Sequence, residues 1–286
     1  MSLDDKDLNL DQAVIDSFGQ EWETFNYSDG DTKEALDLQF AAYIEPIDLS
    51  IFDPNSSIAA DFGAGSGRWS ARLLPHFSKV YALEPSDGAH AVLLKKFAGE
   101  SRILVLNATV GANSIPDESL DLGMSLGVLH HIPNTPLAIQ HVAQKIKPGG
   151  FFLCYLYYKI EDKPLYYRLI FKVVDIMRRK ISRLPRKSKR ISTSIIAAVI
   201  YWPLARFSKL LITLKFNVAN IPLHHYANMP FMMLANDSLD RFGTSLEQRF
   251  NKGDIIAMLE QADFNLSTLV FSELEPFWTF AIQKNS

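Results

Sequence analysis

Three glycines spaced two residues apart are the feature of this chain best suited to holding a nucleotide-like ligand. Gly63, Gly65 and Gly67 follow a short apolar run that contains Asp61. Glycine allows a tight turn and lets the backbone approach a ligand without a collision at Cβ. An apolar strand that turns through alternating glycines is typical of a cofactor site.

The residues after the glycines narrow the class of cofactor. We expect a helix that begins near Ser66 and presents unsatisfied N–H groups to the ligand. A dinucleotide fingerprint requires G-x-G-x-x-G, but Arg68 stands where its third glycine belongs. The loop is therefore G-x-G-x-G, which disfavours a nicotinamide dinucleotide.

Two more polar positions follow the next apolar runs. Glu84 directly follows the apolar run of residues 79–83. A carboxylate at this position can accept hydrogen bonds from both hydroxyls of a ribose and would repel a 2′-phosphate. Residues 103–106 lead into Asn107 and Ala108, where a side-chain oxygen and a backbone N–H suit the amino edge of an adenine. The sequence thus predicts an adenine and a free ribose.

The elements that must position these residues alternate between strands and helices from residue 57 to residue 158. Such alternation predicts an α/β fold around a parallel sheet. Residues 120–132 give a fourth strand that runs into His130 and His131. Before the sheet, residues 32–44 repeat apolar side chains at helical spacing, and Pro46 ends that helix.

With these motifs in this order, the sequence resembles the class I S-adenosylmethionine-dependent methyltransferases, particularly the small-molecule and lipid methyltransferases whose fourth strand ends like SLGVLHHI. The resemblance covers residues 57–158 closely and returns at 249–284 as a closing helix and strand hairpin. It implies a Rossmann-like α/β fold with seven strands in the order 3-2-1-4-5-7-6, the seventh antiparallel. It also implies an N-terminal helical cap and a large helical insertion before the last two strands.

The resemblance further implies S-adenosylmethionine as the cofactor and assigns residues to it. By this resemblance the glycine loop surrounds the methionine part of the cofactor. Glu84 binds its ribose, and Asn107 with Ala108 binds its adenine. The family more often has Asp where Asn107 stands, although an amide oxygen still accepts from an adenine amino group. The full set of expected cofactor residues is Asp61, Gly63, Ala64, Gly65, Gly67, Glu84, Pro85, Asn107, Ala108 and Leu126.

Methyl transfer from a sulfonium depends mainly on alignment and desolvation, and it needs a general base only where the acceptor retains its proton. The candidate bases are His130 and His131, at the mouth of the predicted cleft, and Tyr226. For His130 a structural capping role is an equal alternative. Arg241 and His225 are the substrate candidates, with a structural salt bridge the alternative for Arg241. We expect no metal, because adjacent histidines rarely face one ion.

The chain divides into four predicted segments. Residues 1–50 form an N-terminal helical cap, in which Trp22 or Tyr27 is either a lid residue over the cofactor or an apolar anchor. Residues 51–158 form the cofactor-binding core, residues 159–248 a basic, apolar helical insertion that serves as a substrate lid, and residues 249–286 the closing helix and hairpin.

The insertion concentrates positive charge. Residues 159–215 hold 15 Lys or Arg against 3 Asp or Glu, although the whole chain has a net charge of −3. Residues 164–181 form a basic amphipathic helix. The apolar run at 195–214 is interrupted by Pro203, Arg206 and Lys209, so we expect it to fall short of the roughly 20 apolar residues that a membrane span needs.

Two interpretations of the insertion stay open. It is a lid whose cations face solvent, or it makes peripheral contact with an anionic membrane through residues 159–215. Nucleic acid is a disfavoured partner, because no recognition module surrounds the basic run.

Composition agrees with an enzyme that has a sizeable core, at 286 residues, 48% hydrophobic and 21% charged. The acidic start lacks the apolar region of a secretory signal, and the single cysteine, Cys154, is expected to be a core residue. These features favour a cytoplasmic protein, at the membrane surface if the insertion binds lipid.

The sequence therefore predicts an S-adenosylmethionine-dependent methyltransferase that acts on a small or lipid-like acceptor bound by the insertion. Two alternatives remain at this point. One is an NAD-linked oxidoreductase of Rossmann fold, and the other is a non-catalytic, membrane-associated protein that keeps the methyltransferase fold.

Overall fold

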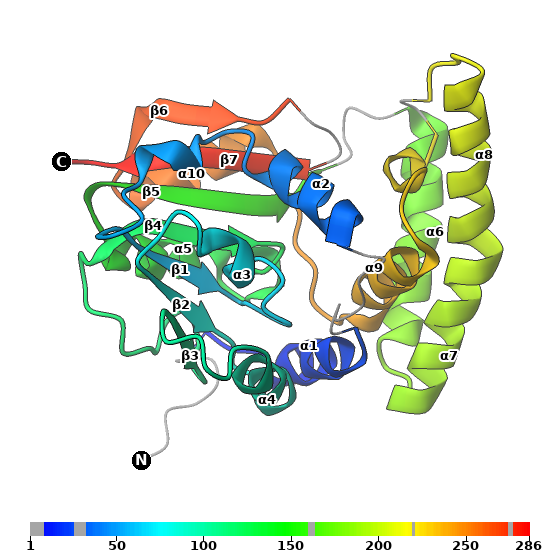
Figure 1. Ribbon diagram of the computed structural model, residues 1–286. Coiled ribbons are helices and arrows are strands. Elements are labelled where there is room, and N and C mark those ends of the chain that lie inside the picture. Colours follow the sequence, from blue (N-terminus) through cyan, green and yellow to red (C-terminus); the bar gives the residue numbers. More distant parts are fainter. Residues whose placement is uncertain (1–8, 26–32, 160–163, 219–220, 274–276) are drawn as a thin grey trace. The chain divides into compact units, whose positions relative to one another are not determined.

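The computed structural model describes residues 9–25, 33–159, 164–218, 221–273 and 277–286. The chain forms two compact units (Figure 1). The core unit consists of Met1–Asp29, Leu36–Lys159 and Leu246–Ser286, and the helical unit of Gly30–Ala35 and Ile160–Ser245. The predicted N-terminal cap thus groups largely with the predicted cofactor core, and the helical unit corresponds to the predicted insertion.

Seven strands form one sheet in the core unit. They are β1 (Ile58–Phe62), β2 (Lys79–Leu83), β3 (Ile103–Leu106), β4 (Leu120–Leu126), β5 (Ile146–Tyr157), β6 (Phe264–Phe271) and β7 (Phe277–Lys284). Their order is β3-β2-β1-β4-β5-β7-β6, and β7 alone runs antiparallel to its neighbours. The predicted fold class and strand order are confirmed.

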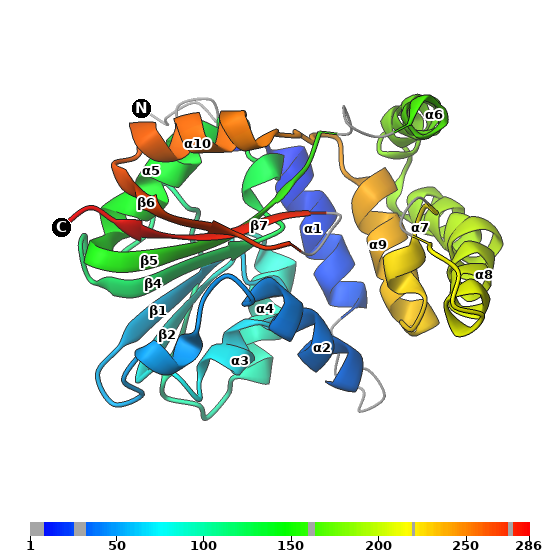
Figure 2. The ribbon, with the colours of Figure 1, turned by 90° about the horizontal axis from the view of Figure 1, so that it is seen from above.

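Helices cover both faces of this sheet, as Figure 2 shows from above. The helices of the core unit are α1 (Gln12–Thr24), most of α2 (Lys33–Tyr43), α3 (Ser70–Leu73), α4 (Asp87–Lys96), α5 (Thr135–Lys145) and α10 (Lys252–Gln261), with the 3-10 turns η2 (Leu49–Ile51) and η3 (Leu129–His131). Helix α3 packs on β1 and β2, and α4 on β3, while α5 and α10 pack together on the opposite face. The strands after β1 are added first on one side of it (β2, β3) and then on the other side (β4, β5). Because the connections between parallel strands are right-handed, the helices of these two halves lie on opposite faces of the sheet.

Apolar side chains from both sheet faces build the core. Phe62, Phe152 and Phe280 are fully buried within it. The thiol of Cys154 lies in the same cluster, and burial raises its pKa well above the ordinary value. Because only a thiolate is reactive, Cys154 acts as a small apolar residue.

The strand register aligns the ends of the first three strands. Phe62 pairs with Leu83, and Leu83 pairs with Leu106. The next residue of each strand is therefore at the same height along the carboxyl edge of the sheet. These residues are Gly63, Glu84 and Asn107. The edge lies where strand order reverses around β1, which is the usual ligand position in open parallel sheets.

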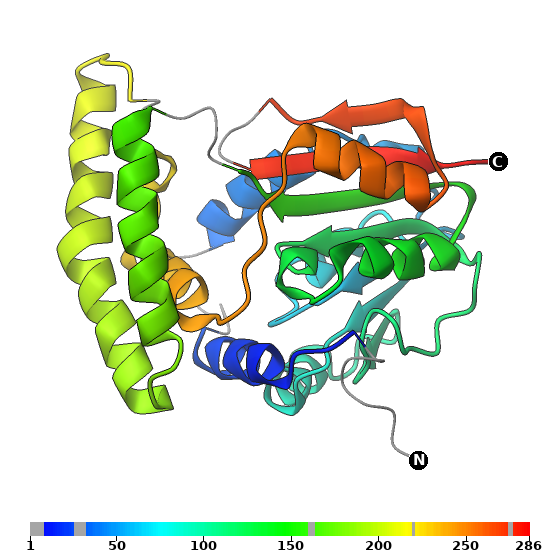
Figure 3. The same cartoon turned by 180° about the vertical axis from the view of Figure 1, so that it is seen from behind.

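The helical unit contains four longer helices and two short ones. They are α6 (Leu165–Ile181), α7 (Arg186–Ile196), the π-helix η4 (Ala197–Tyr201), α8 (Trp202–Thr213), the 3-10 turn η5 (His224–Tyr226) and α9 (Phe231–Gly243). Helix α9 packs against α6, α7 and η4, and Figure 3 shows α6 and α8 from behind. A buried cluster that includes Ile196, Tyr201 and Leu234 holds the unit together.

Helices α7, η4 and α8 form one continuous helix from Arg186 to Thr213. Pro203 removes a backbone donor and crowds the preceding turn, and the π-helical turn just before it absorbs that disruption. The helix has 28 residues, and an 18-residue window within it has a mean hydropathy of 1.6. The expectation that this apolar run falls short of a membrane span is therefore wrong by length and composition, although helices of soluble cores pass the same test.

The two ends of the inserted segment leave the core unit side by side. The backbone N–H of Lys159 donates to Phe250 O at 2.9 Å, and that of Phe250 donates to Tyr157 O at 2.9 Å. Arg249 also donates to Tyr158 O at 3.2 Å. These bonds extend the edge of β5 and fix both points where the chain enters and leaves the insertion.

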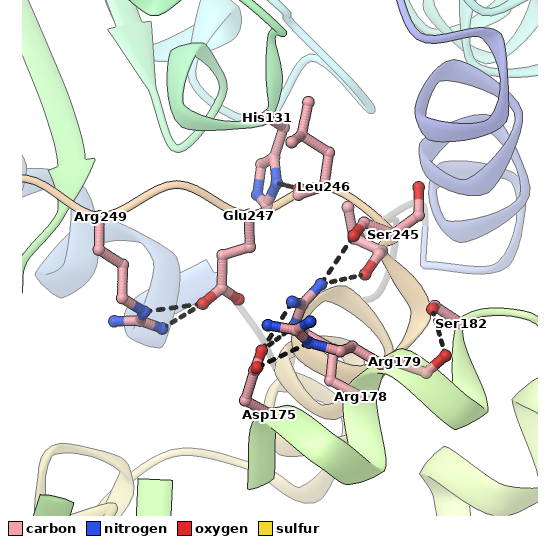
Figure 4. A network of polar contacts seen from close by, with 10 residues as sticks. His131, Asp175, Arg178, Arg179, Ser182, Ser245, Leu246, Glu247 and Arg249 are labelled. Carbon is pink, nitrogen blue, oxygen red and sulfur yellow. Dashed lines mark hydrogen bonds and ion pairs between the residues drawn. The ribbon is translucent and has the colours of Figure 1, made fainter. Parts of the chain in front are cut away.

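Arg178 ties α6 to the end of α9 (Figure 4). Its buried guanidinium donates to Thr244 O at 3.1 Å and Ser245 O at 2.8 Å, and it pairs with Asp175 at 2.7 Å. Arg179 pairs with the same carboxylate at 2.8 Å, but its side chain is 68% exposed. Of these two arginines, Arg178 is the one that donates to backbone carbonyls at the end of α9.

Replacing Arg178 by Ala is expected to destabilise the helical unit by about 2–3 kcal/mol, because two carbonyls and Asp175 lose a charged donor. The matched Arg179→Ala change is expected to cost under about 1 kcal/mol, as for exposed ion pairs. Thermal unfolding and limited proteolysis measure both. Equal effects of the two substitutions would contradict a structural role for Arg178.

Candidate functional site

The glycine loop is locked against the end of β2. The N–H groups of Gly63 and Ala64 donate to Leu83 O at 3.0 and 2.8 Å. Gly63, Gly65 and Gly67 have φ values of +84°, +56° and +70°, which side chains with a Cβ rarely adopt. The predicted requirement for glycine at these positions thus follows from the backbone itself.

The expected helix near Ser66 does not form there. Residues 64–69 form turns, and α3 begins only at Ser70 and is four residues long. The positive φ of Gly67 is incompatible with a right-handed helix, which delays its start. Donors for a ligand must therefore come from the loop itself rather than from a long helix.

Glu84 is buried at the carboxyl end of β2, 4% exposed, and it holds the loop in place. Its Oε2 accepts the N–H of Gly65 at 3.0 Å, and its Oε1 accepts the N–H of Ser86 at 3.0 Å. A carboxylate oxygen has two acceptor sites, so each oxygen retains one for a ribose hydroxyl. Burial raises the pKa of Glu84 to about 7, against the lowering effect of these two bonds.

Asp61 is the second buried carboxylate beside the loop. Ser70 Oγ donates to its Oδ2 at 2.6 Å, which connects the end of β1 to the start of α3. Burial raises the pKa of Asp61 to about 6, and the negative charge of Asp61 adds to the rise at Glu84. Two carboxylates therefore share one side of the glycine loop.

Helix α1 packs directly on this loop and on α4. A Cβ added to Gly65 would lie 2.7 Å from the indole of Trp22. The guanidinium of Arg68 lies over the rings of Trp22 and Trp69, 4.7 Å from each centroid. Trp22 thus contacts the glycine loop, whereas Tyr27 is outside the described residues.

The packing of α1 also explains two glycines outside the loop. Gly19 lies against Ser86, and Gly88 lies against Glu23, each too close for a side chain. These close contacts bring α1 against the segment that follows Glu84. Sequence analysis missed them, although a glycine inside a helix, as at position 19, is a signal of close backbone approach.

The remaining cofactor candidates lie at the same edge. Asn107 Nδ2 donates to Asp87 Oδ1 at 2.7 Å, which leaves the amide oxygen of Asn107 as an acceptor. Ala108 follows it, and Pro85 and Ala64 follow Glu84 and Gly63. Leu126 is buried at the end of β4. The sheet therefore brings together all ten residues of the predicted cofactor set.

His130 is fully buried after β4 and stacks on Tyr157, with ring centroids 3.9 Å apart. Neither ring nitrogen has a hydrogen-bond partner within the described part of the chain. Burial lowers the pKa of His130 well below its ordinary value, so the imidazole is neutral at neutral pH. Tyr157 was not predicted, because a stack between the turn after β4 and the end of β5 joins residues far apart in the sequence and leaves no local pattern.

His131 is fixed by the segment that re-enters the core unit (Figure 4). Its Nδ1 lies 2.7 Å from Leu246 O, and Gln248 N donates to His130 O at 3.0 Å. A carbonyl only accepts, so Nδ1 carries the hydrogen in this contact. The ring of Phe18 from α1 lies 4.9 Å from the His131 ring.

The candidates predicted in the insertion gather inside the helical unit. Tyr226 and His225 have ring centroids 4.0 Å apart, and Arg241 Nε lies 3.9 Å from Asp237 Oδ2. Burial, and then Asp237, raises the pKa of Tyr226 well above its ordinary value. Burial, and then Arg241, lowers the pKa of His225 to about 3. Tyr226 is therefore a proton donor at neutral pH and is poorly suited to act as a base.

No cluster of three or more His, Cys, Asp or Glu suited to a metal ion occurs in the residues that the structure describes.

Comparisons with known proteins place the core among methyltransferases. Residues 60–154 match a family model described as a methyltransferase domain. An uncharacterised methyltransferase of Geobacillus kaustophilus is 27% identical over 144 residues, covering 49% of this chain and 65% of that protein. The chain thus matches just under two thirds of the length of this relative.

Two solved structures share the fold. Human N-acetylserotonin methyltransferase in complex with SAM has a TM-score of 0.53 and 15% identity, covering 94% of this chain and 57% of that one. A methyltransferase of unproven activity from Bacillus halodurans has a TM-score of 0.50 and 12% identity, covering 87% and 100%. The domain match over residues 60–154 and the strand order bear out the predicted methyltransferase fold of the core, and neither supports the NAD-linked alternative.

The buried carboxylate of Glu84 predicts how stability depends on pH without cofactor. Its pKa is about 7 in the folded chain against an ordinary 4.5, so the folded state binds more protons between these values. Glu84 by itself should therefore lower the free energy of unfolding by up to about 3 kcal/mol as pH rises from about 4.5 to 7, whereas the buried neutral His130 and His225, whose pKa values are lowered, contribute a rise over pH values below about 6.5. Asp61 adds a fall in the same direction between 3.8 and about 6.

Denaturant unfolding at fixed pH values tests this. Glu84→Gln should remove the falling contribution of Glu84, so the stability of the variant relative to the wild type should increase from pH 5 to 7, whereas the exposed Glu260→Gln should leave the pH dependence of the wild type unchanged. A difference between Glu84→Gln and the wild type that does not change with pH would show that Glu84 is ionised without penalty.

Proposed function

We propose that this chain transfers a methyl group from S-adenosylmethionine to a small or lipid-like acceptor. The observation that carries the proposal is the alignment of Gly63, Glu84 and Asn107 at one edge of a methyltransferase sheet, with Glu84 bonded to the glycine loop. S-adenosylmethionine, when bound, supplies an electrophilic methyl group on a sulfonium.

The residues at this edge fit the parts of that cofactor. Glu84 has one acceptor site left on each oxygen, which suits two vicinal ribose hydroxyls. Asn107 keeps its amide oxygen for an adenine amino group, because its nitrogen is held by Asp87. Asp61 and the glycine loop are left for the methionine part, where two carboxylates favour a cationic group.

The proton of the acceptor is the second chemical requirement. His130 is neutral, and its ring nitrogens are not used by the described residues, so it has the acceptor site that a base needs. His131 is held by Leu246 through Nδ1, which fixes the orientation of its ring beside His130. An acceptor that is already deprotonated would need neither.

The helical unit supports an acceptor with apolar character. Many of its apolar side chains are exposed, and Tyr226 lies in the same buried cluster as Leu234. We propose that the protein acts in the cytoplasm, where S-adenosylmethionine is made and where a reduced cysteine is stable.

Cofactor binding tests the assignment of the site. Glu84→Ala should weaken S-adenosylmethionine binding by roughly 10- to 150-fold, equivalent to about 1.5–3 kcal/mol for charge-assisted bonds. Gly65→Val should abolish binding, because its φ of +56° and the nearby Trp22 leave no room for a side chain. Titration calorimetry measures both, with Glu260→Gln as the exposed control. Unchanged affinity in a folded Glu84→Ala protein, or tight binding of NAD alone, would overturn the assignment.

Acceptor transfer tests the activity itself. Incubation with methyl-labelled cofactor and a cell extract, followed by separation into aqueous and organic phases, should give label in a small molecule or lipid. The Glu84→Ala variant should reduce this label in proportion to its lost affinity. Cofactor binding without transfer to any fraction would favour the non-catalytic alternative, and label confined to protein or nucleic acid would exclude the proposed acceptor class.

A further inference from the structure

Helix α6 has two apolar faces, and only one of them is used inside the helical unit. Val174, Met177 and Ile181 pack against the buried cluster of the unit. A second stripe of side chains, spaced four, four and three residues apart, is 53–69% exposed and consists of Leu165, Leu169, Val173 and Ile176. Helical spacing places this stripe along a single outward face.

The continuous helix α7–α8 repeats this arrangement. Ile196, Tyr201 and Ala205 face the buried cluster. On other faces the helix exposes apolar side chains at 51–67%, which are Ile191, Ile195, Val199, Phe207, Leu210 and Leu214. Apolar residues scattered singly are normal on a protein surface, whereas exposed apolar side chains repeated along each of two long helices are typical of an interaction surface.

Positive charge borders these rows. Asp175 is the only acid between residues 164 and 215, and Arg178 and Arg179 already pair with it. The exposed cations of α6, α7 and the turn between them are Arg168, Lys172, Arg179, Lys180, Arg183, Arg186, Lys187 and Arg190. On α6, Arg168 and Lys172 lie beside the exposed apolar stripe, at helical positions between it and the packed face.

We propose that the helical unit docks on the surface of an anionic phospholipid bilayer through the outward rows of α6 and α7–α8. The apolar side chains enter the boundary between headgroups and acyl chains, and the long cationic side chains extend to the phosphates. Charge complementarity identifies this occupant, because an excess of cations beside apolar side chains matches a negatively charged, apolar interface. The docking does not depend on the proposed methyl transfer.

The packing of α7–α8 favours a position on the surface rather than across the bilayer. A helix that spans alone must be apolar on all sides. This one commits the face of Ile196 and Tyr201 to the unit and carries Arg206 and Lys209 in its second half. Arg206 is already bound to Met229 O at 2.7 Å.

The structure also selects which cations to test. Arg178 and Lys189 belong to the basic run, but Arg178 holds the end of α9 and Lys189 donates to Gly243 O at 3.0 Å. Their replacement would disturb folding as well as charge. The informative substitutions are therefore Arg168→Gln, Lys172→Gln, Arg183→Gln, Lys187→Gln and Arg190→Gln, combined in one variant.

Sedimentation of the full chain with vesicles tests the proposal. The wild type should sediment with vesicles of phosphatidylcholine and phosphatidylglycerol, and far less with vesicles of phosphatidylcholine alone. Salt at about 0.5 M should release it, because the Debye length is then roughly 4 Å. In the variant that carries all five Gln substitutions, the partition coefficient should be at least about 100-fold lower, because each surface cation raises it by a factor of roughly 5.

Matched variants separate charge from apolar insertion. Leu165→Ser, Leu169→Ser and Val173→Ser, all exposed, should weaken binding with equal loss for both vesicle types. A control with Lys95→Gln and Lys252→Gln, which removes exposed cations of the core unit, should bind as the wild type does. Circular dichroism and S-adenosylmethionine affinity establish that each variant is folded.

Three results would overturn docking at the bilayer surface. One is a wild type that stays in the supernatant at low salt, and another is a protein that resists extraction by alkaline carbonate, which would indicate a span. The third is a stable dimer in solution that the apolar variant dissociates, which would make the rows an interface between copies. Because cofactor binding is measured separately, failure here would leave the proposed methyl transfer standing.

Discussion

The hydrogen bond from the N–H of Gly65 to Glu84 connects the two halves of the cofactor site, and the arrangement of the loop depends on it. This bond joins the turn after β1 to the end of β2. The same carboxylate also accepts a hydrogen bond from Ser86 N, at the start of α4. The carboxylate can take this position only because β1 and β2 are parallel and in register, so that Phe62 lies beside Leu83. Burial at this point favours the protonated acid, and ligand hydroxyls favour the ionised one. The same group therefore links loop geometry to proton uptake.

Much of the core was predictable because its signals are local. Strands that are buried on both faces appear as short apolar runs, and each carries its polar residue immediately after its last apolar position. Glu84 and Asn107 could be found in this way. The start of α3 could not, because the choice between a turn and a helix at Ser66 depends on the φ of Gly67, which packs between Leu93 and Phe97 of a later element.

Contacts between residues that are far apart in the chain could not be predicted from the sequence. The stack of His130 on Tyr157 joins β4 to β5, and the bond from His131 to Leu246 joins residues 115 apart. The contact of Trp22 with Gly65 likewise needs α1 to cross the loop. For α7–α8 the apolar run was present in the sequence, but its length was underestimated, because Pro203 and the two cations after it do not interrupt the helix and the π-turn before Pro203 permits the helix to continue.

The clamp formed by residues 157–159 and 249–250 has a consequence for how the chain is assembled. Because both ends of the inserted segment meet at one end of β5, the insertion is a closed loop with respect to the folding of the core. The entropy lost in closing a loop grows only with the logarithm of its length, so the core tolerates a segment of this size nearly as well as a short connection. The length and composition of the inserted helices can therefore change at little cost to the folding of the core sheet.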